Sequence, residues 1–146
     1  MDNSVGRLQS LFPKQQFEII VGSLLGDARL ECRSLGVRAE KTARFRVHHG
    51  EKQAVYVGWK YEMLKQFVSA PPRAVTRFDG KRNIFETSWY FHTKSTKELG
   101  VLHDWFYPNN GVKQLPNNLE QIFSPRMLAV WYMDDGSYTV NSCTLN

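Results

Sequence analysis

Apolar positions recur along this chain with two different periods, and the change of period separates predicted helices from predicted strands. Residues 1–12 show no sustained pattern and are expected to form a loose lead-in. From Pro13 to Gly26 the apolar residues lie three or four positions apart, which predicts a helix. A two-residue period follows, in which Leu30, Phe45 and Val47 alternate with charged residues. This period predicts half-buried strands.

The middle of the chain repeats the same order of patterns. Residues 51–68 carry apolar residues at helical spacing. A second hairpin is predicted around Asp79-Gly80, a dipeptide typical of two-residue turns. Residues 95–98 read Ser-Thr-Lys-Glu, a capping box that predicts a helix ending near Phe106. The pattern therefore predicts helix, two strands, helix, two strands, helix, an α+β chain with antiparallel strands.

The most informative stretch reads LAVWYMDDG at residues 128–136, after the helix-starting pair Ser124-Pro125. Gly136 is expected to end this helix. The adjacent acids Asp134 and Asp135 then fall in the last turn, where the helix dipole disfavours a carboxylate by about 0.3–1 kcal/mol. A positive group should offset them, and a divalent cation is the strongest candidate.

A similar stretch, IVGSLLGDA, occupies residues 20–28 and carries Asp27 just after its apolar run, 108 residues before Asp135. Gly22 and Gly26 lie four residues apart and therefore on one helix face. Glycine inside a helix costs about 1 kcal/mol relative to alanine, so a packing reason is expected. Close approach of a second helix would supply that reason.

The two stretches resemble the signature helices of LAGLIDADG homing endonucleases, in the monomeric branch that carries two motifs. The run KQLPNN at residues 113–118, ahead of the second stretch, strengthens the resemblance. It implies one αββαββα unit with an antiparallel sheet over residues 1–123. Residues 124–146 would then be a signature helix and the start of an incomplete second repeat. The ten residues after Gly136 leave room for at most one strand.

The resemblance also implies a site. Asp27 and Asp135 would lie side by side and each bind Mg²⁺ at a scissile phosphate, with Mn²⁺ as a substitute. Lys113 matches a basic residue that family members carry near an acid, where it would polarise the attacking water or stabilise the transition state. A surface lysine is the alternative for Lys113. Asp134 occupies the alanine position of the signature and is expected only to support the acids.

The charge distribution indicates a polyanionic partner. The net charge is +5 and the pI about 9.3, and residues 29–82 contain 13 basic but only 5 acidic side chains. Basic residues on the outer faces of the predicted strands suit phosphates and base edges. Solvated charges on a free sheet face are the alternative. The predicted DNA contacts are Arg29, Arg33, Arg44, Arg46, His48, Arg77, Lys81 and Arg82.

Other classes are poorly supported. The two cysteines are too far apart in sequence for a disulfide framework or a zinc site. No apolar run approaches the roughly 18–20 residues of a membrane span. The N-terminus lacks the apolar core of a secretory signal, so an intracellular location is expected, in the cytoplasm, the nucleoid or an organelle matrix.

Three hypotheses follow for the function. The first is a site-specific, Mg²⁺-dependent endonuclease that cuts double-stranded DNA, or the N-terminal part of one. The second is a non-cleaving nucleic-acid binder, such as a maturase that acts on intron RNA. The third is an inactive remnant. Without a second sheet, the helix face that includes Trp131 is expected to be exposed, so a second chain or fragment would complete the repeat.

Overall fold

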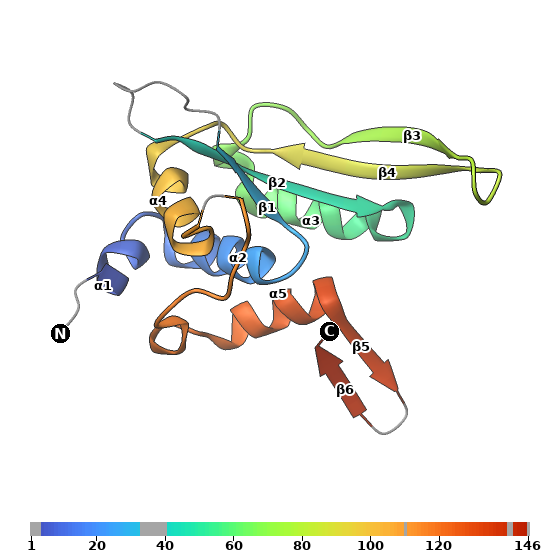
Figure 1. Ribbon diagram of the computed structural model, residues 1–146. Helices are drawn as coiled ribbons and strands as arrows, with labels where there is room; N and C mark the ends of the chain where they lie inside the picture. Colours follow the sequence, from blue (N-terminus) through green and yellow to red (C-terminus); the bar gives the residue numbers. More distant parts are fainter. Residues whose placement is uncertain (1–3, 33–40, 110, 140–141, 146) are drawn as a thin grey trace.

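The computed structural model describes residues 4–32, 41–109, 111–139 and 142–145, and in them a four-stranded antiparallel sheet is covered by helices on one face (Figure 1). The strand order is β1-β2-β4-β3. In chain order the elements of this unit are α1 (Ser4–Gln9), α2 (Lys14–Leu25), β1 (Arg29–Cys32), β2 (Ala43–Gly50), η1 (Glu51–Gln53), α3 (Ala54–Leu64), η2 (Lys65–Phe67), β3 (Arg73–Asp79), β4 (Ile84–His92) and α4 (Lys97–Phe106). The predicted α+β class and the order αββαββα, from α2 to α4, are confirmed.

The sheet has one buried and one open face because successive side chains of a strand point to opposite sides. Phe45 and Val47 of β2 are 0% exposed and face the helices, together with Phe91 of β4. Arg44 and Arg46 alternate with them and lie on the open face. The predicted two-residue period is therefore correct for β2.

The N-terminal lead-in is more ordered than expected. It forms the short helix α1, whose Val5 and Leu8 join the hydrophobic core with Phe12 just after it. Spaced three apart, Val5 and Leu8 are too few to indicate a helix by periodicity, so only packing against the body reveals it.

Three local predictions require correction. The helix predicted over residues 51–68 consists of a 3₁₀ turn, α3 and a second 3₁₀ turn. The loop between β3 and β4 contains four residues, with Asn83 at φ 54°, and is not the two-residue turn predicted at Asp79-Gly80. The N-cap of α4 is Thr96, whose hydroxyl accepts from the Leu99 N–H. The third helical position is therefore Leu99 and not Glu98, so the capping box predicted for residues 95–98 does not form.

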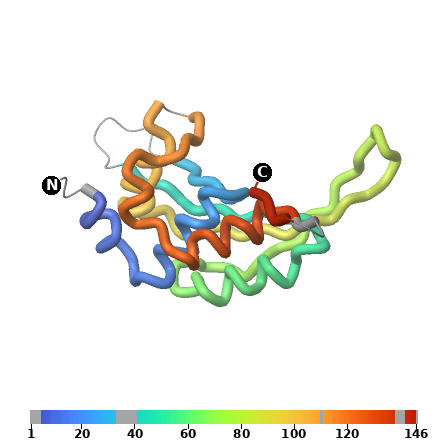
Figure 2. The backbone as a smooth tube through the Cα atoms, turned by 90° about the horizontal axis from the view of Figure 1, so that it is seen from below, coloured from blue at the N-terminus to red at the C-terminus, as the bar shows by residue number. Residues whose placement is uncertain are grey.

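The hairpin β3–β4 extends past the helices, as both views of the backbone show (Figures 1 and 2). The rings of Phe78 and Phe85 pair across it, with centroids 5.2 Å apart, on the face that the helices cover elsewhere. They are 55% and 75% exposed because no helix reaches this part of the hairpin.

The C-terminal segment packs against the first unit through its helix. Two strands follow that helix, so the expectation of at most one strand was wrong. Trp131 is half-buried rather than exposed, with its ring edge-on to Phe123. The exposed large apolar residues of the helix are instead Leu128 and Met133, at 44% and 52%. The elements of this segment are η3 (Leu119–Gln121), α5 (Pro125–Asp135), β5 (Gly136–Thr139) and β6 (Ser142–Leu145).

Candidate active site

Helices α2 and α5 lie side by side and in parallel. Near their N-termini, the buried carboxylate of Glu18 accepts hydrogen bonds from the Ser124 hydroxyl and the Arg126 guanidinium. Farther along, a Cβ on Gly22 would meet the Met127 carbonyl oxygen and the Val130 Cβ at 2.9 Å each. Glycine is therefore required there for the backbones to approach, which confirms the packing reason expected from the sequence.

The parallel packing brings the C-terminal ends of the two helices together, and with them the two signature acids. Asp27 follows α2 closely, and its side chain is 49% exposed. Asp135 is the last residue of α5. Partial burial raises the pKa of Asp135, and a hydrogen bond and charge repulsion from the neighbouring Asp27 carboxyl raise it further. The structure thus places Asp27 beside Asp135; their roles in catalysis remain predictions.

Asp134 makes several buried contacts beside the two acids. Its side chain is 0% exposed, and its Oδ1 lies 2.9 Å from the Lys60 ammonium, which is also fully buried. The Tyr56 hydroxyl donates to the same oxygen at 2.7 Å. Its Oδ2 accepts from the backbone N–H of Asp27 at 3.1 Å. The carboxylate of Asp134 therefore ties α3, α5 and the residue that carries the first acid into one network.

His49 of β2 lies between the carboxylates of Asp27 and Asp134. Its Nδ1 is 3.9 Å from Asp27 Oδ2, and its Nε2 is 3.9 Å from Asp134 Oδ1. Burial lowers the pKa of His49, as does the charge of Lys60, while Asp134 opposes that shift. Its neighbour His48 lies on the open face, because adjacent residues of a strand point to opposite sides.

Lys113 reaches the end of α2 from the loop before α5. Its ammonium donates to the carbonyl oxygens of Gly26 and Ala28, both at 2.8 Å. These contacts flank Asp27 and offset the negative end of the helix dipole. Burial lowers the pKa of Lys113, against the opposing charges of Asp135 and Asp27. The structure therefore brings Lys113 to the two acids, whereas its chemical role is untested.

The open face of the sheet begins directly after Asp27. Arg29, Arg44, Arg46 and His48 lie on it in neighbouring positions of β1 and β2, and Arg77 lies farther along on β3. Lys81 and Arg82 follow β3 in the hairpin loop, where Arg82 pairs with the carboxylates of Asp79 and Glu86. Arg33 lies outside the described residues. The structure therefore places the described predicted contacts on one face and one hairpin, and none of them is tested as a contact to DNA.

The sequence pattern did not indicate Tyr56, Lys60 or His49 as residues of the site. One signal for Lys60 was present, because it lies three residues after the buried Val57 and four before the buried Leu64 of α3. A lysine on the apolar side of a helix needs a buried partner. The partner, 74 residues away, could not be identified from that spacing.

The exposed part of this site offers a divalent cation too few protein ligands to complete its coordination. Among the described residues, no three histidine, cysteine or acidic side chains are grouped so that they could hold a metal ion. Asp27 and Asp135 would supply two oxygen ligands of the kind that Mg²⁺ prefers, and water and phosphate commonly complete its coordination. The donor chemistry is therefore compatible with Mg²⁺ bound together with a substrate.

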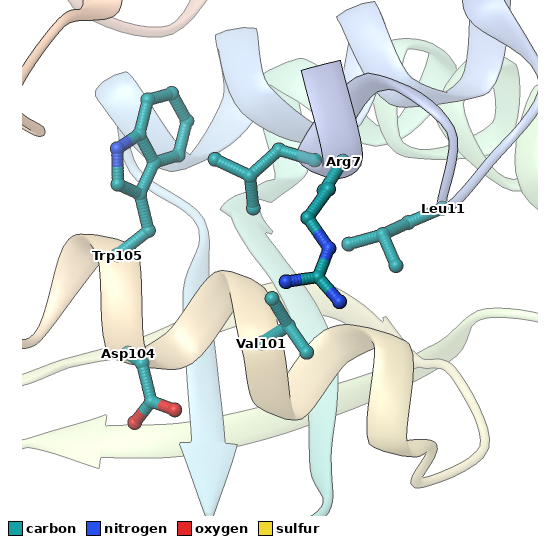
Figure 3. Close-up of a pocket in the computed structure, with 6 residues that line it drawn as sticks. Arg7, Leu11, Val101, Asp104 and Trp105 are labelled. Atoms are coloured by element: carbon teal, nitrogen blue, oxygen red, sulfur yellow. The ribbon is translucent and has the colours of Figure 1, made fainter. Parts of the chain in front are cut away.

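A separate groove of about 550 Å³ lies between α1 and α4, away from the acids (Figure 3). Figure 3 shows Arg7 and Leu11 facing Val101 and Trp105 across it. The groove is mainly apolar and contains no residue of the candidate site.

None of the described helices is both long enough and apolar enough to cross a membrane.

The chain is similar to one protein family over most of its length and to proteins of three kinds. The profile of the LAGLIDADG DNA endonuclease family matches residues 17–146. Protein RecA of Mycolicibacterium flavescens is 36% identical over 128 residues, covering 88% of this chain and 27% of that protein. DNA endonuclease I-ChuI of Chlamydomonas applanata is 33% identical over 132 residues, covering 85% of this chain and 58% of I-ChuI. Cytochrome b mRNA maturase bI2 of Debaryomyces hansenii is 30% identical over 144 residues, covering 91% of this chain and 52% of the maturase.

A solved structure agrees in fold. The homing endonuclease I-WcaI, bound to its DNA recognition sequence, superposes with a TM-score of 0.73 at 22% identity. The superposition covers 94% of this chain and 59% of I-WcaI. The chain thus spans less than two thirds of the length of each of these proteins.

Proposed function

The chain belongs to the LAGLIDADG DNA endonuclease family, and on this basis we propose that it is a site-specific endonuclease for double-stranded DNA, or part of one. The observation that carries the proposal is the pairing of Asp27 with Asp135 where two parallel helices end. This pair lies next to the sheet face that carries Arg29 and Arg46, so a duplex on that face would bring its phosphates to the acids.

The chemistry would divide among a few residues. Asp27 and Asp135 would hold Mg²⁺, or Mn²⁺ in its place, as members of this family generally use a divalent metal. When bound, such an ion supplies a nucleophilic water and stabilises charge on the phosphate oxygens. The Lys113 ammonium, held by two backbone carbonyls, would place its positive charge beside the reacting phosphate.

The buried pair Lys60–Asp134 would serve the acids by holding them in position. Asp134 accepts the N–H of Asp27 and precedes Asp135 directly in the chain. A shift of about 1 Å in either acid would lower the rate substantially. Because Lys60 neutralises Asp134, a third acidic group can lie beside two others without leaving a further unpaired negative charge in the interior.

We further propose that residues 1–123 form one repeat and that residues 124–146 begin a second. Leu128 and Met133 of α5 would then contact a second sheet supplied by another chain or fragment. Light scattering at increasing protein concentration tests this. The mass should rise for the wild type and stay monomeric for the variant Leu128→Glu with Met133→Glu. A wild type that remains monomeric, and gains no activity from an added fragment, would contradict it.

The function itself is tested by incubating a library of plasmids carrying random inserts with the protein and Mg²⁺, and sequencing the ends produced. The wild type should produce double-strand breaks at one recurring site when it self-associates or when the fragment that completes the second repeat is added, and should cut poorly as an isolated monomer. Asp27→Asn and Asp135→Asn should bind the same site without cutting it. Glu62→Gln, on the solvent side of α3, provides a control that should cut normally.

The non-cleaving binder remains the second candidate, because the maturase relative matches nearly the whole chain. It predicts a different outcome from the same assay. Binding by the wild type without cleavage, together with higher affinity for a structured RNA than for the duplex, would favour the binder. Cleavage that persists in Asp135→Asn would contradict the proposed site.

A further inference from the structure

Four charged side chains form a grid on the open face of the sheet. The strands β1 and β2 are antiparallel, with Arg29 opposite Arg46 and Glu31 opposite Arg44. All four side chains point away from the helices. Glu31 is therefore a single acid at one corner of a grid whose other three corners are arginines.

The carboxylate of Glu31 contacts each of these arginines. Its Oε1 lies 3.3 Å from Arg44 Nε and 3.8 Å from Arg46 Nη1, and its Oε2 lies 3.9 Å from Arg29 Nη2. Burial opposes ionisation of this carboxyl group, but the arginines, Arg44 first, hold the pKa of Glu31 below its ordinary value. Glu31 is thus a permanent anion near neutral pH.

The arginines of β2 are largely enclosed, and Arg46 is contacted on a second side. The side chains of Arg44 and Arg46 are only 13% and 19% exposed. The Arg46 guanidinium also lies 5.0 Å from the centre of the Tyr90 ring. Among the described residues, the Nε of Arg46 has no hydrogen-bond partner. These guanidinium groups are therefore restrained in orientation before any ligand arrives.

We propose that Glu31 is a specificity-determining residue of the DNA-binding face: it orients Arg44 and Arg46 toward base edges and keeps phosphate groups out of the cluster. The inference rests on the proposed function. An arginine identifies guanine through two parallel hydrogen bonds, which require a fixed guanidinium plane. A phosphate, in contrast, accepts from any nearby cation and carries no sequence information. The anion at the centre of the cluster favours the first kind of contact by repelling the second.

A purely structural role makes a different prediction. Arg29 and Arg46 are like charges directly opposite each other, an arrangement that destabilises a sheet, and Glu31 would offset their repulsion. Removal of Glu31 would then lower the melting temperature but leave the sequence preference of the folded protein unchanged. Sequence preference therefore separates the two roles.

The test compares Glu31→Gln with Glu86→Gln. Both remove one negative charge from the open face, but Glu86 pairs with Arg82 at the far end of the hairpin and lies outside the grid. Duplexes are first selected from a random pool with the wild-type protein. Affinities for the selected duplex and for a random-sequence duplex are then measured over a range of salt concentrations, below the melting temperature of each variant.

Glu31→Gln should bind the random duplex about eightfold more tightly at 0.1 M salt, with a salt slope steeper by about 0.9, as expected for one additional phosphate contact. The ratio of selected to random affinity should fall roughly tenfold, which corresponds to the loss of one two-bond base contact. Glu86→Gln should also bind the random duplex more tightly but keep the wild-type ratio. Glu31→Asp, which retains the charge, should keep most of the wild-type ratio of selected to random affinity.

The outcomes distinguish this inference from the proposed function. If Glu31→Gln and Glu86→Gln lower the ratio equally, or neither changes it, the inference is overturned and the proposed function stands. If the wild type shows no salt-dependent binding to any duplex, the proposed function fails and the inference fails with it. If Glu31→Gln does not fold, Glu31→Asp is measured in its place. A Glu31→Asp protein that binds the selected and the random duplex with equal affinity would likewise overturn the inference.

Discussion

The ammonium of Lys60 and the carboxylate of Asp134 form a fully buried ion pair, 2.9 Å apart, directly behind the two candidate catalytic acids. Each group is costly to bury without the other. Asp134 has further hydrogen-bond partners in Tyr56 and in the N–H of Asp27. The pair therefore links the stability of the fold to the geometry of the site.

Lys60→Met should destabilise the protein by about 3–5 kcal/mol, because it leaves the Asp134 carboxylate buried without its countercharge. The double variant with Asp134→Asn should recover part of that loss, since both charges are then absent. Urea-induced unfolding of the two single variants and the double variant measures the coupling. Additive losses in this cycle would show that the two side chains do not act as a pair.

Gly22→Ala should destabilise by about 1–3 kcal/mol, because the new methyl group would meet the backbone of Met127 and force α2 and α5 apart. Gly58→Ala is the matched control. A Cβ on Gly58, inside α3, meets nothing within 4 Å, so that change should stabilise by roughly 0.5–1 kcal/mol. Thermal unfolding of both variants measures the contrast, and equal effects would argue against close helix contact at Gly22.

Mg²⁺ or Ca²⁺ should raise the melting temperature if Asp27 and Asp135 share a metal site. Binding to the native state alone stabilises by about 2.7 kcal/mol at a hundredfold excess over the dissociation constant. Asp135→Asn should abolish the rise. Asp104→Asn, which changes an exposed acid on α4, should retain it. A metal response that is the same in both variants would place the ion elsewhere.

The stability of the protein should decrease as the pH falls from about 7.5 to about 5.5, in part because of His49. Burial, followed by the charge of Lys60, lowers the pKa of His49 below its ordinary value of 6.5. The unfolded chain therefore takes up a proton before the native state does, and the stabilisation present above pH 6.5 is lost as the pH falls toward the lower native pKa.

His49→Asn should make this pH dependence shallower, by less than about 1.4 kcal/mol per pH unit, the limit for one proton. His48→Asn serves as the comparison, because His48 lies on the open face and its removal should flatten the curve less. The measurement is the free energy of unfolding in urea at several pH values. An unchanged slope in His49→Asn would show that this histidine does not titrate differently in the two states.

The sequence alone determined the elements whose signal is local. Helical spacing identified α2 and α5, and strict alternation identified β2, because these periods reflect burial on one side of an element. The two acids were paired through the resemblance of their helices to the LAGLIDADG signature helices, and Gly22 of α2 is what allows the close approach to α5. The α+β order followed from these elements.

Tertiary structure decided which charges are buried and which are neutralised. Lys60 could be placed on α3 but not against Asp134, and His49 could be placed on the inner face but not between two carboxylates. Glu31 was visible in the sequence only as one charge among several, whereas the register of β1 with β2 surrounds it with arginines. The physical reason is that the free energy of a charge depends on its partners and on its exclusion from water. Both are set by contacts between residues far apart in the chain, and a local pattern does not contain them.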